Sequence, residues 1–228
     1  MESSRRTFLL GTAGLLAAAT PAAALAAGPA GTPQPSSAAA LKTLMDGNAR
    51  YVADQAICPP LTARRIELAA GQRPFAIIVS CSDSRVPVET VFDQSPGSIF
   101  GIRLAGNFVD DHGLGSIEYS VASFASSLIL VLGHSDCGAV KATVQYVKDG
   151  TTQPGHIQSL VDALAPAARA SKGRPGNWYA NATEQNVHDT IAALTQRSTI
   201  VAKAVKEGGL AIAGGVYDLH TGRISIVH

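Results

Sequence analysis

Two apolar runs restrict the possible folds of this chain more than any other feature. Residues 75–79 (FAIIV) and 128–132 (LILVL) are apolar at every position, unlike a strand that has one face in water. Strands of this kind are buried on both faces, which requires helices on both sides of the sheet. Segments between them, such as residues 137–150, carry apolar residues at helical spacing. The sequence therefore predicts an α/β protein with a mostly parallel central β-sheet flanked by helices.

The same patterns place the remaining elements. We expect helices at residues 36–54, 61–74, 112–126, 137–150, 156–170 and 181–207, the first of them capped by Ser37. We expect strands at residues 75–80, 98–107 and 127–133 and two more within 210–228, where the turn HTG separates them. Residues 37–228 contain no internal repeat and no long linker, so a single domain is predicted there.

The N-terminal segment, residues 1–26, has a different character. Arg5 and Arg6 precede a mildly apolar stretch that ends in small residues, and this resembles a twin-arginine export signal. It implies a periplasmic protein, with residues 27–36 as a flexible lead-in and no stable membrane insertion after cleavage. A membrane anchor is the alternative, because residues 8–27 are nearly uncharged, but their glycines, threonines and proline make a poor span.

Charge is balanced along the chain. The sequence has 18 basic and 17 acidic residues and no block of like charge, which argues against nucleic acid or an anionic membrane surface as the main partner. Aromatic residues make up 5% of the chain, which favours closely packed helices over an aromatic binding platform.

Cysteine and histidine stand at the ends of both apolar runs. Cys81 follows the first run, His134 comes just after the second, and Cys137 opens the next predicted helix. Ligands of parallel sheets bind beyond the carboxyl ends of the strands, so these side chains are expected to meet there. Thiolates and an imidazole are ligands that zinc prefers, and three of them leave a fourth position for water. Each residue alone is better explained as a packed core side chain; together, at matched strand ends, they predict a catalytic zinc site.

Two neighbouring residues are assigned other roles. Cys58 precedes two prolines and is expected to be a buried small hydrophobe. Asp136, between the histidine and the cysteine of the second motif, is expected to serve the turn or the helix start rather than the metal. With two cysteines on a metal, an odd number of cysteines in an exported chain does not require a disulfide.

Several motifs give the chain a family resemblance. The stretches CSDSR and, about fifty residues later, HSDCGAV are supported by GQRP, RLAGN and SIEYSV. Together they resemble a β-class carbonic anhydrase from about residue 40 to the end. The resemblance implies a parallel sheet with an antiparallel edge strand, dimers as the basic unit or higher oligomers built from them, and carbon dioxide and bicarbonate as ligands. It also implies one Zn²⁺ per chain, bound by Cys81, His134 and Cys137.

The resemblance assigns Asp83 and Arg85 to a catalytic pair. A carboxylate two residues beyond a ligand can itself take the fourth position on zinc, and a planar guanidinium can hold it away. Asp83 would then accept a hydrogen bond from zinc-bound hydroxide and direct it at carbon dioxide. A loop-stabilising ion pair is the alternative, and spacing alone does not decide between them.

Further family positions concern substrate binding. Gln72 matches an amide that hydrogen-bonds a substrate oxygen, and Phe100, Ala105 and Tyr119 match an apolar pocket at the dimer interface. The backbone N–H of Gly138, at a helix start, is expected to stabilise the charge that develops on bicarbonate. Alone, the two aromatic residues would be assigned to the core.

Some positions bear on regulation by bicarbonate. Ile78 departs from the tryptophan that regulated bacterial members carry, whereas Arg103 and Tyr217 match two other members of that set. Regulation is therefore left open.

Three functions fit these observations. The first is reversible hydration of carbon dioxide to bicarbonate and a proton, by attack of zinc-bound hydroxide. The second keeps the site but hydrolyses carbon disulfide or a related small molecule, which depends on access to the site. The third is a zinc-binding module without catalysis, which would not need Asp83, Arg85 and Gln72 around an open position.

Overall fold

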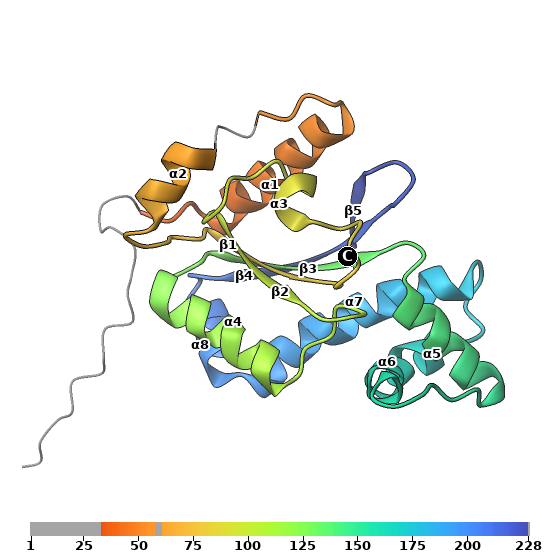
Figure 1. Ribbon diagram of the computed structural model, residues 1–228. Helices are drawn as coiled ribbons and strands as arrows, with labels where there is room; N and C mark the ends of the chain where they lie inside the picture. Colours follow the sequence, from red (N-terminus) through yellow and green to blue (C-terminus); the bar gives the residue numbers. More distant parts are fainter. Residues whose placement is uncertain (1–32, 58–60, 228) are drawn as a thin grey trace, which may run out of the picture.

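A five-stranded sheet forms the centre of the computed structural model, which describes residues 33–57 and 61–227 (Figure 1). Its strand order is β2-β1-β3-β4-β5. The strands are β1 (Ala76–Ser80), β2 (Ile99–Arg103), β3 (Leu128–His134), β4 (Ala211–Tyr217) and β5 (Ile224–Val227). All neighbouring pairs are parallel except β4 and β5, which are antiparallel. The predicted fold, a mostly parallel sheet with an antiparallel edge strand, is confirmed.

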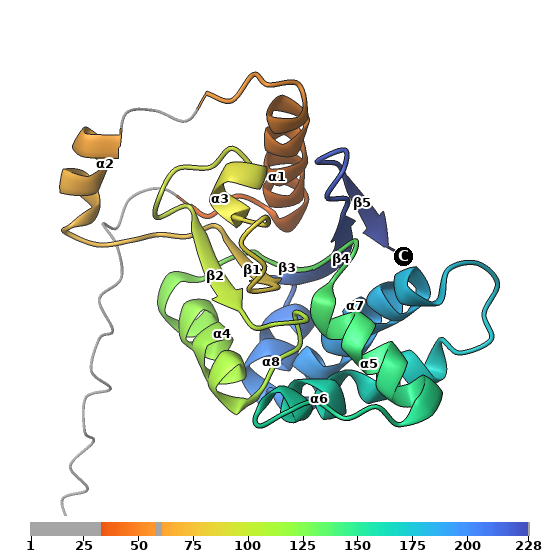
Figure 2. The same cartoon turned by 45° about the vertical axis from the view of Figure 1, so that its right-hand side comes forward.

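Helices cover both faces of this sheet. They are α1 (Ser37–Val52), α2 (Leu61–Leu68), α3 (Val88–Val91), α4 (Asp111–Phe124), α5 (Gly138–Asp149), α6 (Ile157–Ala170), α7 (Trp178–Arg197) and α8 (Thr199–Lys206). The helices α1 and α3 pack on one face, and α4, α7 and α8 pack on the other (Figures 1 and 2). The helices α5 and α6 pack against each other and against α7. No helix among the described residues has both the length and the apolar character needed to cross a membrane.

The two apolar runs form the most buried strands of the sheet. Every residue of β1 and β3 is buried. Alternate side chains serve opposite faces: Ile78 packs with Leu130 on the α1 side, whereas Ile77 packs with Ile129 on the α7 side. This two-sided burial is what an uninterrupted apolar run requires, and it explains why these strands lack a polar face.

The helical segments differ from the prediction in five places, one of which is that α2 ends at Leu68 instead of residue 74. The helix expected at residues 181–207 is two helices, α7 and α8, which are divided at Ser198. The Ser198 hydroxyl accepts from the Val201 backbone N–H and lies 2.6 Å from Glu118 Oε1, so it caps α8 and links it to α4. The short helix α3 was not predicted. In addition, α1 is capped by Ser36 rather than Ser37, and α7 begins three residues early, behind Asn177.

Three predictions fall wholly or mostly on residues whose structure is not described. The export signal at residues 1–26 lies outside the described residues, as do most of the lead-in and Cys58. The prediction of a single domain for residues 37–228 also stays a prediction, because residues 58–60 and 228 within that range are not described.

Candidate metal centre

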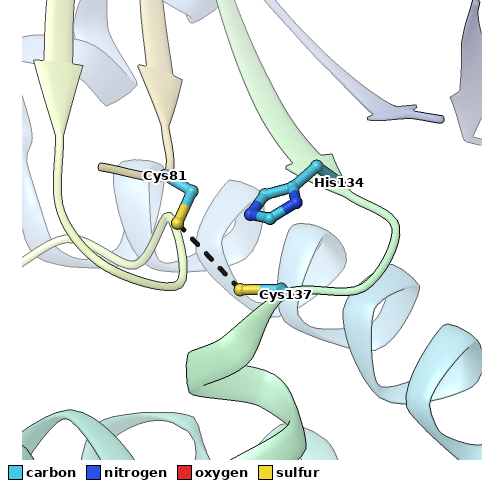
Figure 3. Close-up of side chains that lie close together, drawn as sticks. All are labelled: Cys81, His134 and Cys137. Atoms are coloured by element: carbon cyan, nitrogen blue, oxygen red, sulfur yellow. Dashed lines mark hydrogen bonds between the residues drawn. The ribbon is translucent and has the colours of Figure 1, made fainter. Parts of the chain in front are cut away.

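Two cysteines and a histidine meet at the carboxyl ends of β1 and β3. The ligand atoms of Cys81, His134 and Cys137 all lie within 4.8 Å of one another, and the two sulfur atoms are 4.0 Å apart (Figure 3). Zn–S bonds of about 2.3 Å in a tetrahedral site would place two sulfurs about 3.8 Å apart. The three side chains are at most 5% exposed. The arrangement therefore fits a tetrahedral ion of the size of zinc.

The local backbone explains how these side chains converge. Cys81 directly follows β1 and His134 is the last residue of β3, and these strands are paired in parallel. Asp136 has a φ of 57° and so turns the chain back sharply, a conformation that aspartate tolerates better than most residues. Cys137 then occupies the N-cap position of α5. Asp136 thus has the turn role that the sequence predicts.

The histidine ring is oriented as a metal-binding imidazole would be. Its Nδ1 lies 2.8 Å from the Ser135 carbonyl oxygen, so the N–H at this position donates and leaves the lone pair on Nε2. Nε2 is fully buried and has no hydrogen-bond partner among the described residues. A buried nitrogen without a partner is costly, and a metal ion between the two sulfurs would satisfy it.

The two thiols ionise unequally. The hydrogen bond from the Cys137 thiol lowers the pKa of Cys81 to about 4, an effect that burial opposes and that His134 and the Gly106 N–H reinforce. The pKa of Cys137 is raised, because its thiol is the donor in that bond, because it is buried, and because the charge of Cys81 is close. Cys81 thus carries a negative charge readily, whereas Cys137 keeps its proton. A dication bound to both sulfurs would stabilise Cys137 as a thiolate too.

Beside the ligands, Asp83 is held by Arg85. The Arg85 Nε donates to Oδ1 at 2.9 Å and Nη2 donates to Oδ2 at 2.7 Å, and the Arg85 backbone N–H also donates to Oδ1. The arginine's hydrogen bonds hold the pKa of Asp83 well below its usual range, although partial burial opposes this. Oδ2 lies 3.9 Å from His134 Nε2. The carboxylate therefore stands next to the candidate metal centre while both its oxygens are bonded to arginine.

Arg103 supports this loop in a way that the sequence did not predict. As the last residue of β2, it donates to the carbonyl oxygens of Cys81 at 3.0 Å and of Asp83 at 2.6 Å. Tyr217, which like Arg103 matches a position of the regulated bacterial relatives, is buried, with its hydroxyl 3.2 Å from that of Tyr51. Spacing in the sequence carries no signal for either contact, because both cross between elements.

The predicted substrate residues occupy several elements. The rings of Phe100 on β2 and Tyr119 on α4 have centroids 6.2 Å apart, and both lie close to Phe124. The other members of the set are Gln72 before β1, Ala105 after β2 and Gly138 at the first position of α5. The structure thus brings Phe100 and Tyr119 together in one partly exposed aromatic cluster.

Comparison with known proteins identifies the family. The sequence model described as carbonic anhydrase matches residues 76–224. Carbonic anhydrase 2 of Mycobacterium tuberculosis is 42% identical over 193 residues, which cover 84% of this chain and 93% of that protein. The carbonic anhydrase of Pseudomonas aeruginosa is 34% identical over 192 residues, which cover 81% of this chain and 86% of that protein.

Solved structures agree. A tetrameric β-carbonic anhydrase of Sordaria macrospora superposes with a TM-score of 0.64 at 26% identity, covering 82% of this chain and 96% of that one. The Coccomyxa β-carbonic anhydrase in complex with acetazolamide gives a TM-score of 0.63 at 26% identity, covering 82% and 86% respectively.

Fold and site define an α/β protein with a candidate metal centre of two cysteines and a histidine at the ends of parallel strands. The chain belongs to the carbonic anhydrase family, and its structural similarities place it in the β class. Its enzymatic class is therefore that of a carbonic anhydrase, a lyase, and the reaction of this family is the hydration of carbon dioxide. The resemblance to a β-class carbonic anhydrase found in the sequence is confirmed.

Proposed function

We propose that this protein catalyses the zinc-dependent, reversible hydration of carbon dioxide to bicarbonate and a proton. The observation that carries the proposal is the buried group of Cys81, His134 and Cys137, with an unpartnered Nε2 and two sulfurs 4.0 Å apart. Zinc held there supplies one chemistry: it lowers the pKa of a water that it binds, which gives a nucleophile near neutral pH. Three protein ligands leave one tetrahedral position for that water.

Asp83 and Arg85 control that fourth position. Arg85 occupies both oxygens of Asp83, so the carboxylate is kept off the metal although it lies 3.9 Å from the His134 nitrogen. Asp83 stays anionic because Arg85 lowers its pKa. It accepts the hydrogen bond of the attacking water and orients the water's lone pair toward carbon dioxide.

Carbon dioxide is apolar, and its product is an anion. We assign the apolar contacts to Phe100, Ala105 and Tyr119, and a hydrogen bond to a substrate oxygen to Gln72. The backbone N–H of Gly138 opens α5, where the unpaired N–H groups of a helix favour negative charge, so it stabilises the developing bicarbonate.

The proposal is tested first by the metal itself. We expect one zinc per chain, with two sulfur ligands at about 2.3 Å and one nitrogen at about 2.0–2.1 Å. Elemental analysis gives the stoichiometry, and X-ray absorption at the zinc edge gives the ligands. A zinc shell of oxygen and nitrogen only, without sulfur, would exclude the two cysteines.

We propose that the active form is a dimer or an assembly of dimers. The edge strand β2 pairs only with β1 among the described strands, and it carries Phe100 of the partly exposed aromatic cluster. The Sordaria relative is tetrameric, which supports an assembly of this kind. Light scattering of the purified protein is expected to give an even multiple of the chain mass; a monomer at assay concentration would contradict the assembly.

We also propose that residues 1–26 export the folded protein to the periplasm. The support is the Arg5–Arg6 pair followed by a mildly apolar stretch with small residues at its end. Changing both arginines to lysine is expected to leave active protein in the cytoplasm with its signal attached. Cell fractionation and mass spectrometry of the N-terminus measure this, and unaltered periplasmic delivery would mean that the segment has another role.

A further inference from the structure

One backbone N–H points at a metal ligand from a loop that follows β2. The amide of Gly106 donates to Cys81 Sγ, with 3.3 Å between nitrogen and sulfur, in a buried setting. A thiolate that accepts a hydrogen bond gives up part of its charge to the donor, so such a bond affects how strongly the sulfur donates to a metal.

The geometry of Gly106 explains why a glycine stands here. Its φ is +88°, a backbone angle that residues other than glycine rarely adopt. A Cβ at this position would come within 2.6 Å of Leu164 Cδ1 on α6. The glycine therefore lets the loop pass closely between the candidate metal centre and α6. The same freedom means that glycine by itself does not fix the direction of its N–H.

An anchor on α7 fixes that direction. The Asn186 side chain donates from Nδ2 to the Gly106 carbonyl oxygen at 2.7 Å, and the residue is 4% exposed. Gly106 is thus bonded on both sides of its Cα: its N–H to Cys81 and its carbonyl to Asn186. Residues 80 positions apart in the sequence are joined by this one contact.

A second residue of α7 bonds the same loop more weakly. Thr190, one helical turn after Asn186, is also 4% exposed, and its hydroxyl donates to the Asn107 carbonyl oxygen at 3.4 Å. This hydrogen bond is made to Asn107, the residue after Gly106. It involves neither Gly106 nor Cys81, the two residues of the N–H···S bond. It therefore provides a natural comparison for the role of Asn186.

We propose that Asn186 is a positioning residue of the metal centre: by holding the Gly106 carbonyl, it keeps the Gly106 N–H on the sulfur of Cys81. This inference rests on the proposed function only in that Cys81 binds the metal. The bond withdraws electron density from the thiolate and orients it. Outer contacts of this kind typically change metal affinity by about 10–100-fold when they are removed.

The test replaces Asn186 with leucine, which has nearly the same shape but neither a hydrogen-bond donor nor an acceptor. We expect zinc affinity, measured by competition with a chelator, to fall by roughly tenfold or more, because the loss of a fixed orientation of the sulfur outweighs the electron density that it regains. In the cobalt-substituted protein, we expect the thiolate-to-metal charge-transfer band to move to lower energy, because the sulfur loses its donor. Thr190→Val, which removes a donor from the same loop, is the matched control and should change neither quantity appreciably.

Two outcomes would overturn the inference. One is a folded Asn186→Leu protein with the wild-type zinc affinity and cobalt spectrum. The other is equal shifts in Asn186→Leu and Thr190→Val, which would indicate general loosening of the loop. If Asn186→Leu does not fold, Asn186→Ala gives the same test, since alanine removes the donor without adding bulk. Failure of the metal assignment is distinguishable, because the wild-type protein would then show no cobalt–thiolate band; failure of carbon dioxide hydration alone would leave that band in place.

Discussion

Replacing Cys137 with serine is expected to abolish zinc binding and carbon dioxide hydration together. Serine is a poor zinc ligand at neutral pH, because its hydroxyl stays protonated where a thiol beside a dication ionises. Only Cys81 and His134 would then be left to hold the zinc. Among the described residues, Asp83 is the one carboxylate found close to these two side chains, so few groups could replace the lost thiolate. Elemental analysis and an assay of hydration on the same preparation measure both losses.

Cys58→Ser is the control for this change. Cys58 is the remaining cysteine of the chain and is assigned no part in metal binding. That variant is expected to keep its zinc and its activity. Full zinc occupancy in Cys137→Ser, with zinc lost from Cys58→Ser instead, would contradict the ligand assignment.

Arg85→Ala is expected to keep zinc and lose activity by on the order of 100-fold. Arg85 contributes no ligand, so the metal stays. Without its two side-chain hydrogen bonds, Asp83 is an unpaired carboxylate 3.9 Å from the His134 nitrogen, and it can turn to the metal and take the position that water needs. Zinc content and hydration rate give the two halves of the result, and a crystal structure of the variant shows where Asp83 lies.

Two companion variants sharpen this prediction. Asp83→Asn also keeps zinc but loses the negative acceptor, so its defect should lie mainly in turnover. Lys141→Ala breaks a neighbouring ion pair, 2.6 Å between Lys141 Nζ and Asp136, which does not touch Asp83. That control should remain close to the wild-type rate. Near wild-type activity in Arg85→Ala, with water still on the metal, would show that the Asp83–Arg85 pair does not control the site.

The sequence predicted those parts of the fold that depend on local pattern. The runs before Cys81 and His134 are apolar at every position and alternate with helical segments, which favours buried parallel strands, so both strands and their ends could be placed. Because parallel strands end at one edge of the sheet, the meeting of Cys81, His134 and Cys137 could be predicted as well. The break between α7 and α8 was missed: Ser198 is of a type that favours a helix N-cap, but serine also occurs inside helices, and its bonds to Val201 and Glu118 are seen only in the folded chain.

The supporting contacts of the site were not predictable for a related reason. Arg103 reaches the Cys81 and Asp83 carbonyl groups from β2, and Asn186 reaches Gly106 from α7. These bonds join side chains to backbone groups that are distant in sequence, and backbone carbonyl groups carry no sequence signature. Only the folded chain shows them.

The measurement that tests the central claim most directly is stopped-flow hydration of carbon dioxide by the zinc-loaded protein, across a range of pH. We expect a rate well above that of the buffer, which falls as pH falls with a midpoint above about 7, because two thiolates donate more charge than imidazoles. Asp83 does not cause the fall, since Arg85 keeps its pKa low. A zinc-loaded protein that hydrates carbon dioxide no faster than buffer, or that hydrolyses carbon disulfide instead, would contradict this account.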